Sequence, residues 1–100
     1  MSARLASVYG LRAGPCSPVF YIGVTERDPH LRGKEHYWCR EYYGWNEMLR
    51  KELDRGEPDV IVLEVVPVAE MFRAEARWIR TGRALGLPLV NVRPRDGVAA

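Results

Sequence analysis

Two short runs of apolar and aromatic residues open the chain, at residues 4–11 and 18–24. Both are rich in Val, Ile, Tyr and Phe, the residue types that are enriched in β-strands. The segment that joins them, residues 12–17, contains Gly14 and Pro15, which are typical of turns. The pattern therefore predicts a β-hairpin.

Alternation with a period of two predicts which side chains share a face of this hairpin. With the turn centred near Pro15, Tyr9 lies across from Tyr21, and both tyrosines point to the same side. Gly23 then lies across from Ser7 and leaves the tyrosine face shallow and open. The opposite side, which faces the core, carries Phe20, Ile22 and Val24.

Helical patterns follow a loop of charged and turn residues, first over residues 31–39 and again over residues 45–55. Tyr43 and Gly44 mark a break between the two helices. Asn46 is placed to cap the second helix at its N-terminus, and Gly56 is placed to end it. The apolar stripe of that helix consists of Met48, Leu49 and Leu53.

Residues 60–66 form an almost unbroken β-branched run, which predicts a strand covered on both faces in the middle of the sheet. A third helix is predicted over residues 69–85, ending at Gly86, and residues 88–91 form a short apolar return. The predicted fold class is α/β, of the α+β kind. A small central antiparallel three-stranded sheet, made of the hairpin and one later strand, is flanked by three helices in the order ββααβα.

One residue of the third helix conflicts with its amphipathic pattern. At 100° per residue, Phe72, Ala76 and Ile79 share one stripe, and Glu75 falls inside it. An ionised carboxylate on the core side is costly unless it is paired, hydrogen-bonded or bound to a metal. In an arbitrary helix, such a glutamate more often reaches solvent from the edge of the stripe. Its position here makes Glu75 a candidate functional residue.

Composition indicates one compact domain over residues 1–100, because 47% of the residues are hydrophobic. Cys16 and Cys39 are not in a CxxC spacing, and we interpret both as reduced thiols. No segment approaches the ~18 apolar residues that a membrane span needs. We therefore expect a soluble, cytoplasmic protein without a membrane partner.

Charge adds little by itself, because the net charge of +2 is a mild bias. The choice of base is more informative, since thirteen of the fifteen basic residues are arginine. The planar guanidinium grips phosphate in two places, where lysine offers a point charge. An arginine-favouring genome explains the same bias equally well, so both interpretations stay open.

Arg32 and His36 are four residues apart at the start of the first helix, so they project from the same face. They follow directly after the strand that carries Tyr21, which places them near the edge of the tyrosine face. An arginine, an imidazole and two phenols are therefore expected to converge, with Glu75 arriving from the third helix.

This dispersed set resembles the signature of the GIY-YIG nuclease family, over residues 7–91. The first motif is similar to Ser7-Val8-Tyr9, with Ser7 in place of a glycine, and the second matches Tyr21-Ile22-Gly23. The positions that correspond to the catalytic residues of the family are Tyr9, Tyr21, Arg32, His36, Glu75 and Asn91. Arg27 competes with Arg32 for the arginine role, and Arg32 is preferred because it lies one helical turn from His36.

The resemblance implies a minimal divalent-metal-dependent endonuclease, which hydrolyses DNA to 5′-phosphate and 3′-hydroxyl products. Glu75 would hold Mg²⁺ or Mn²⁺ together with several waters. Arg32 would brace the phosphate, and Tyr9, helped by His36 and Tyr21, would position or deprotonate the attacking water.

For Asn91, the resemblance implies a role in organising the acid and its waters. Since family members commonly use a further DNA-binding domain, it also implies a separate DNA-binding partner protein or a second copy of this chain. The alternative function is a non-cleaving module with the same fold, which binds nucleic acid or a partner.

Five aromatic residues between the first two helices allow two interpretations. They could stack on unpaired bases, whereas helical spacing favours core packing for at least half of them. These residues are Tyr37, Trp38, Tyr42, Tyr43 and Trp45. A zinc site at His36 and Cys39 is disfavoured, because two further tetrahedral ligands are lacking. The arginines of the third helix, Arg73, Arg77 and Arg80, are interpreted as a solvated face.

Overall fold

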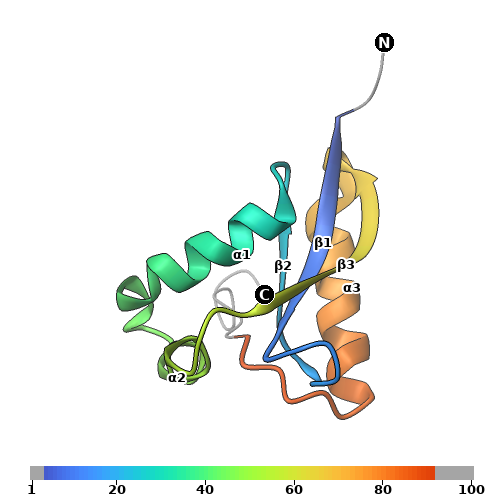
Figure 1. The fold of residues 1–100 in the computed structure, drawn as a ribbon. Helices are drawn as coiled ribbons and strands as arrows, with labels where there is room; N and C mark the ends of the chain where they lie inside the picture. The colour runs from blue at the N-terminus through green and yellow to red at the C-terminus, as the bar shows by residue number, and fades with distance from the viewer. Residues whose placement is uncertain (1–3, 92–100) are drawn as a thin grey trace.

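The structure is a computed structural model that describes residues 4–91. It contains a three-stranded antiparallel sheet and three α-helices in the order ββααβα, which confirms the predicted fold class (Figure 1). The elements are β1 (Leu5–Arg12), β2 (Val19–Thr25), α1 (Pro29–Trp38), α2 (Glu47–Asp54), β3 (Asp59–Pro67) and α3 (Met71–Ala84), with short 3₁₀ helices η1 (Arg40–Tyr43) and η2 (Val68–Glu70).

The helices begin and end where capping residues satisfy their terminal backbone groups. Asn46 caps α2, because its side-chain oxygen accepts a hydrogen bond from the backbone N–H of Leu49 at 3.1 Å. Gly56 and Gly86, after α2 and α3, have φ angles of 148° and 85°. Side chains other than glycine rarely adopt these angles, so both glycines end their helices as predicted.

The strand order is β2-β1-β3, so the prediction that residues 60–66 lie in the middle of the sheet is wrong. The central strand is β1, where Val8 and Leu11 are fully buried. Strand β3 lies at one edge, and Val62 and Val65 are exposed. An apolar run does not reveal how many of its faces are covered, and β-branched residues also suit an edge strand.

The two faces of the sheet are covered by different helices (Figure 1). Helix α3 packs on the face formed by Val8, Ile22 and Val66. Helix α2 contributes Leu49 and Leu53 to the opposite face. The sheet thus has a separate apolar cluster on each side, and any site that uses residues from both sides must lie at an edge.

The face of α3 that packs on the sheet differs from the predicted stripe. Ala74 and Gly82 are buried and Trp78 is half-buried, whereas Phe72 is 67% exposed and Ala76 is also exposed. Small residues bring the helix closest to the sheet, and a stripe drawn through the large side chains misses this. Glu75 therefore lies at the edge of the packed face of α3 and is half-buried.

Cys16 and Cys39 are free and exposed, in agreement with their interpretation as reduced thiols. Within residues 4–91, no helix combines the length and the apolar composition that crossing a membrane requires.

Candidate functional site

The register of the hairpin brings Tyr9 opposite Gly23 and Leu11 opposite Tyr21, two residues away from the predicted pairing. A β-bulge next to Leu11 accounts for one of these two residues, and the turn between Arg12 and Val19 accounts for the other. A shift of two preserves the side on which each residue points, so Tyr9 and Tyr21 still share a face. Phe20 is the exception, since at the bulge it joins the cluster with Leu11 rather than the opposite face.

The tyrosine face is closed rather than open, because the ring of Tyr9 lies over Gly23. A Cβ atom at Gly23 would come within 2.6 Å of the Tyr9 hydroxyl, so no other residue fits there without displacing the phenol. Tyr9 is only 1% exposed as a result. The prediction of a shallow surface at this point was wrong because it treated the missing side chain as empty space.

His36 links two phenols into a chain of hydrogen bonds that is buried at Tyr9 and half-buried at Tyr43. Its Nε2 atom lies 2.7 Å from the hydroxyl of Tyr9, and its Nδ1 atom lies 2.6 Å from the hydroxyl of Tyr43. The ring of Tyr21 meets the imidazole edge-on, with 5.2 Å between ring centroids. A neutral imidazole donates from one nitrogen and accepts at the other, so both contacts are satisfied in either tautomer.

Helix α1 carries His36 to this position because of Gly33, one turn earlier. A Cβ atom at Gly33 would collide with Val60 of β3, so glycine permits the close approach of α1 to the sheet. Burial, together with the nearby positive charge of Arg32, lowers the pKa of His36 to about 4. The imidazole is therefore neutral at pH 7.

The sequence pattern places Tyr43 in the aromatic cluster and at the break between two helices, and does not place it in the site. It follows His36 by seven residues, a spacing that corresponds to two helical turns and so to one side of a helix. The change from α1 to η1 between the two residues hides this relation. The spacing was the only signal in the sequence.

Both phenols of the hairpin are protonated at neutral pH. Burial, together with the neighbouring Tyr21, raises the pKa of Tyr9 well above its ordinary value of 10, and Arg32 opposes the shift. Burial also raises the pKa of Tyr21 to about 12, with contributions from Tyr43 and Glu75. A free phenolate is thus disfavoured in this fold.

Arg32, rather than Arg27, accompanies the phenols. Arg27 is engaged by Glu35 through two hydrogen bonds of 2.6 and 3.1 Å on the surface. The guanidinium of Arg32 lies 3.5 Å from the same carboxylate and close enough to affect the pKa of Tyr9 and of His36. The geometry agrees with the preference for Arg32.

Glu75 acts on the phenols electrostatically, from the helix on the other side of the sheet. Its charge contributes to the raised pKa values of Tyr9 and Tyr21. Burial raises the pKa of Glu75 itself, and no hydrogen bond or positive charge from the described residues offsets this shift. Within residues 4–91, no fully buried side-chain nitrogen or oxygen lacks a partner, so the Glu75 oxygens remain in contact with solvent.

Asn91 holds strand β2 instead of reaching the acid. Its Nδ2 atom donates to the backbone oxygen of Ile22 at 2.8 Å, and its Oδ1 atom accepts from the backbone N–H of Ile22 at 2.9 Å. Both ends of the amide are therefore engaged by β2. Because Ile22 lies between Tyr21 and Gly23, Asn91 fixes the strand that positions the tyrosines.

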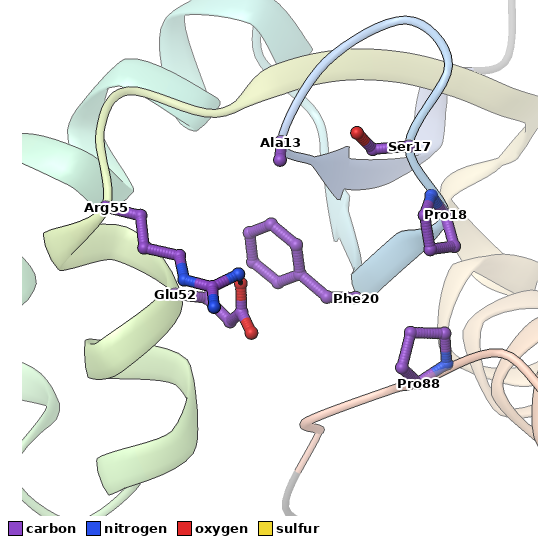
Figure 2. A pocket seen from close by; sticks show the side chains of 7 residues that line it. All are labelled: Ala13, Ser17, Pro18, Phe20, Glu52, Arg55 and Pro88. Carbon is purple, nitrogen blue, oxygen red and sulfur yellow. Dashed lines mark hydrogen bonds and ion pairs between the residues drawn. The ribbon is translucent and has the colours of Figure 1, made fainter.

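A separate concavity of about 200 Å³ lies near the hairpin turn and α2 (Figure 2). Phe20 projects between Arg55 and Glu52 on one side and two prolines on the other, as Figure 2 shows. The charges of Arg55 and Glu52 pair at 3.4 Å, which leaves little net charge for a ligand. It is lined by Ala13, Ser17, Pro18, Phe20, Glu52, Arg55 and Pro88, and so by none of the candidate site residues.

Among residues 4–91, no group of three or more His, Cys, Asp or Glu side chains is arranged to hold a metal ion. Glu75 is a carboxylate whose charge acts on both phenols, and its solvent contact and lack of an internal partner fit a hydrated hard cation, which needs few protein ligands.

Comparisons with protein-family models, with curated proteins and with solved structures find no match for this chain. The interpretation of the site therefore rests on its geometry and chemistry.

Proposed function

We propose that the protein is a divalent-metal-dependent endonuclease of the GIY-YIG type, which hydrolyses DNA phosphodiester bonds to 5′-phosphate and 3′-hydroxyl products. The observation that carries the proposal is the position of Glu75. This half-buried acid, without a partner among residues 4–91, comes from α3 and acts electrostatically on phenols that belong to the other face of the sheet. A carboxylate kept there at a cost in stability calls for a functional reason.

Phosphodiester hydrolysis needs an activated water, positive charge for the phosphate, and stabilisation of the leaving oxygen. Arg32 supplies positive charge at the edge of the phenol cluster. Glu75 would hold Mg²⁺ or Mn²⁺, which supplies Lewis-acid stabilisation of the phosphate and the leaving 3′ oxygen when bound. Tyr21 packs against His36 and keeps the imidazole in place.

The hydrogen-bonded chain of Tyr9, His36 and Tyr43 would activate the attacking water. Because a free phenolate is disfavoured, Tyr9 takes a proton from water only as its own hydroxyl proton passes to Nε2 of His36. His36 is neutral, so the lone pair of its Nε2 atom is available for that proton, but burial makes the resulting imidazolium costly. In this tautomer its Nδ1–H donates to the Tyr43 oxygen, which stabilises the imidazolium that forms.

In the protein without DNA, the carboxylate of Glu35 contacts Arg27 and Arg32. It pairs with Arg27 and lies 3.5 Å from Arg32, at an exposed position where ion pairs are weak. A DNA phosphate carries the same charge and hydrogen-bond acceptors as this carboxylate. Phosphate binding would therefore replace the contact between Glu35 and Arg32 without leaving Arg32 unpaired.

The test is a cleavage assay on a panel of labelled DNA structures, comparing the wild type with Glu75→Ala in Mg²⁺, Mn²⁺ and EDTA. We expect metal-dependent cutting by the wild type, products with 5′-phosphate ends, and loss of cutting in Glu75→Ala. Cutting that survives this substitution would contradict the role of Glu75. Tight DNA binding in EDTA with no cutting in either metal would instead support a binding module with the same fold.

A further inference from the structure

Three large aromatic side chains stand out into solvent between α1 and α2. Trp38 is 60% exposed, Tyr42 is 80% exposed and Trp45 is 62% exposed. Helical spacing favoured core packing for at least half of the five aromatic residues in this segment, yet none of the five is buried. Exposed tryptophans that gather in one short segment are a typical sign of a binding surface.

This segment is linked to the candidate active site by two successive ring contacts. The Trp45 and Tyr43 rings lie 5.9 Å apart between centroids, and the Tyr43 and His36 rings lie 5.6 Å apart in a stacked arrangement. His36 in turn bonds the hydroxyl of Tyr9. Trp45 is therefore two ring contacts away from the imidazole that the proposed chemistry uses.

The surroundings of these rings favour nucleobases over an apolar protein surface. Charged residues, Arg40 and Glu41, lie between Trp38 and Tyr42 along the chain, and Met48 is the one exposed aliphatic residue in segment 38–48. Arg40 lies over the ring of Tyr37 at 4.4 Å and also pairs with Asp54. Isolated aromatic faces beside arginines are the usual platform for single-stranded nucleic acid, since every base has a π-face.

We propose that Trp45, assisted by Trp38 and Tyr42, stacks on unpaired DNA bases that flank the phosphate held by Arg32. The favoured substrate class is then DNA with a single-stranded segment, such as a flap, a gap or a branch, rather than a continuous duplex. This substrate assignment rests on the proposed nuclease function, whereas the stacking contact itself does not.

The experiment measures the affinity of the protein, in EDTA, for fluorescently labelled oligo(dT), oligo(U) and a blunt duplex. Trp45→Ala is compared with the matched control Phe72→Ala, which removes an equally exposed aromatic ring from α3. We expect Trp45→Ala to weaken oligo(dT) binding about tenfold and Phe72→Ala to leave it unchanged. Equal affinities of the two variants, tighter binding of the duplex, or preference for oligo(U) would each overturn the proposal.

A parallel cleavage assay in Mg²⁺ separates this proposal from the nuclease function. If the wild type cuts nothing but binds oligo(dT) through Trp45, the nuclease function fails and the stacking surface stands. If the wild type and Trp45→Ala both cut duplex and single-stranded DNA equally well, the stacking proposal fails and the nuclease function stands. Circular dichroism of each variant establishes that both are folded.

Discussion

The polar groups on the two sides of the sheet are held in opposite ways. On the α1 side, His36 is buried and neutral, and each of its nitrogens bonds a phenol, Tyr9 or Tyr43. On the α3 side, Glu75 is half-buried and has no compensating partner among residues 4–91. The first arrangement is complete within the protein, whereas the second leaves room for a partner from outside.

This difference separates stability from function. A fully satisfied buried network makes a region rigid and specific, because any break leaves an unpaired polar group. An uncompensated carboxylate lowers stability, and proteins retain such groups mainly at functional sites. We therefore expect changes on the α1 side to affect folding and activity together, and changes at Glu75 to affect them in opposite directions.

The largest expected effect is that of Glu75→Gln. Cleavage should fall by about 10²–10³-fold, because the group that would hold the cation is lost. The melting temperature at pH 7 should rise, since a carboxylate with a raised pKa destabilises the fold above its ordinary value of 4.5. Calorimetry and cleavage assays on the same samples measure both effects.

The matched control for this substitution is Glu64→Gln. A hydrogen bond from Trp78 lowers the pKa of Glu64, and an ion pair with Arg77 acts in the same direction, so this carboxylate stabilises the fold. We expect the control to lower the melting temperature and to leave cleavage unchanged. If Glu75→Gln also lowered the melting temperature, the claim that the Glu75 carboxylate destabilises the fold would be wrong.

The next effect in size is the pH dependence that His36 produces. The pKa of His36 is about 4 in the folded protein and 6.5 in the unfolded chain. Between these two pH values, the unfolded chain therefore binds a proton that the folded protein does not. Stability from this source is complete above pH 6.5 and falls by ~3 kcal/mol as the pH drops to 4. Urea unfolding at a series of pH values measures the fall.

Two variants assign this pH dependence to its source. In His36→Phe, we expect a lower stability than that of the wild type at pH 7.5. The stability of this variant should then fall less between pH 7.5 and pH 4 than that of the wild type does. In His30→Gln, which changes an exposed histidine, we expect the decline to persist. A decline of the same size in His36→Phe would show that other groups produce it.

A smaller effect is expected from Gly23→Ala, which adds a Cβ atom where the Tyr9 phenol lies. Overpacking of this kind costs ~1–3 kcal/mol and should displace the phenol from His36. Gly44→Ala is the control, because its added Cβ meets nothing within 4 Å and its backbone is helical. We expect the control to be neutral or slightly stabilising in denaturant unfolding. Equal stability of the two variants would exclude the close approach of Tyr9 and Gly23.

The smallest effect should come from Tyr43→Phe. Loss of the hydroxyl leaves Nδ1 of His36 without its partner and should cost about 1 kcal/mol in urea unfolding. Cleavage should fall mainly through kcat, since Tyr43 supports proton transfer and not DNA binding. Tyr37→Phe removes a hydroxyl from the residue next to His36 and keeps the ring that Arg40 covers, so it should change neither quantity. A fall in cleavage through KM alone would contradict the proton-transfer role.

Local signals in the sequence were sufficient for much of the fold. Asn46 and Gly56 mark the ends of α2 because capping and positive φ angles depend on single residues and their neighbours. The order of elements follows from hydrophobic periodicity. The position of β3 at an edge was not predictable in this way, because strand order depends on how distant segments pair.

The candidate site shows the same limit at the level of single residues. That Tyr9 and Tyr21 share a face was predictable from alternation, whereas their register depended on a bulge and on the centre of the turn, which the sequence does not mark. The engagement of Asn91 by Ile22 and the entry of Tyr43 into the site are also tertiary contacts. Residue types and spacing identified the chemical groups, and only the folded structure shows which of them touch.

The most direct measurement of the central claim is anomalous diffraction from crystals of the protein soaked in Mn²⁺. The account predicts a manganese peak at coordinating distance from the Glu75 carboxylate, on the side that faces Tyr9 and Tyr21, and no such peak in Glu75→Gln. Manganese bound only at other carboxylates, in a protein whose cleavage requires Mn²⁺, would contradict it.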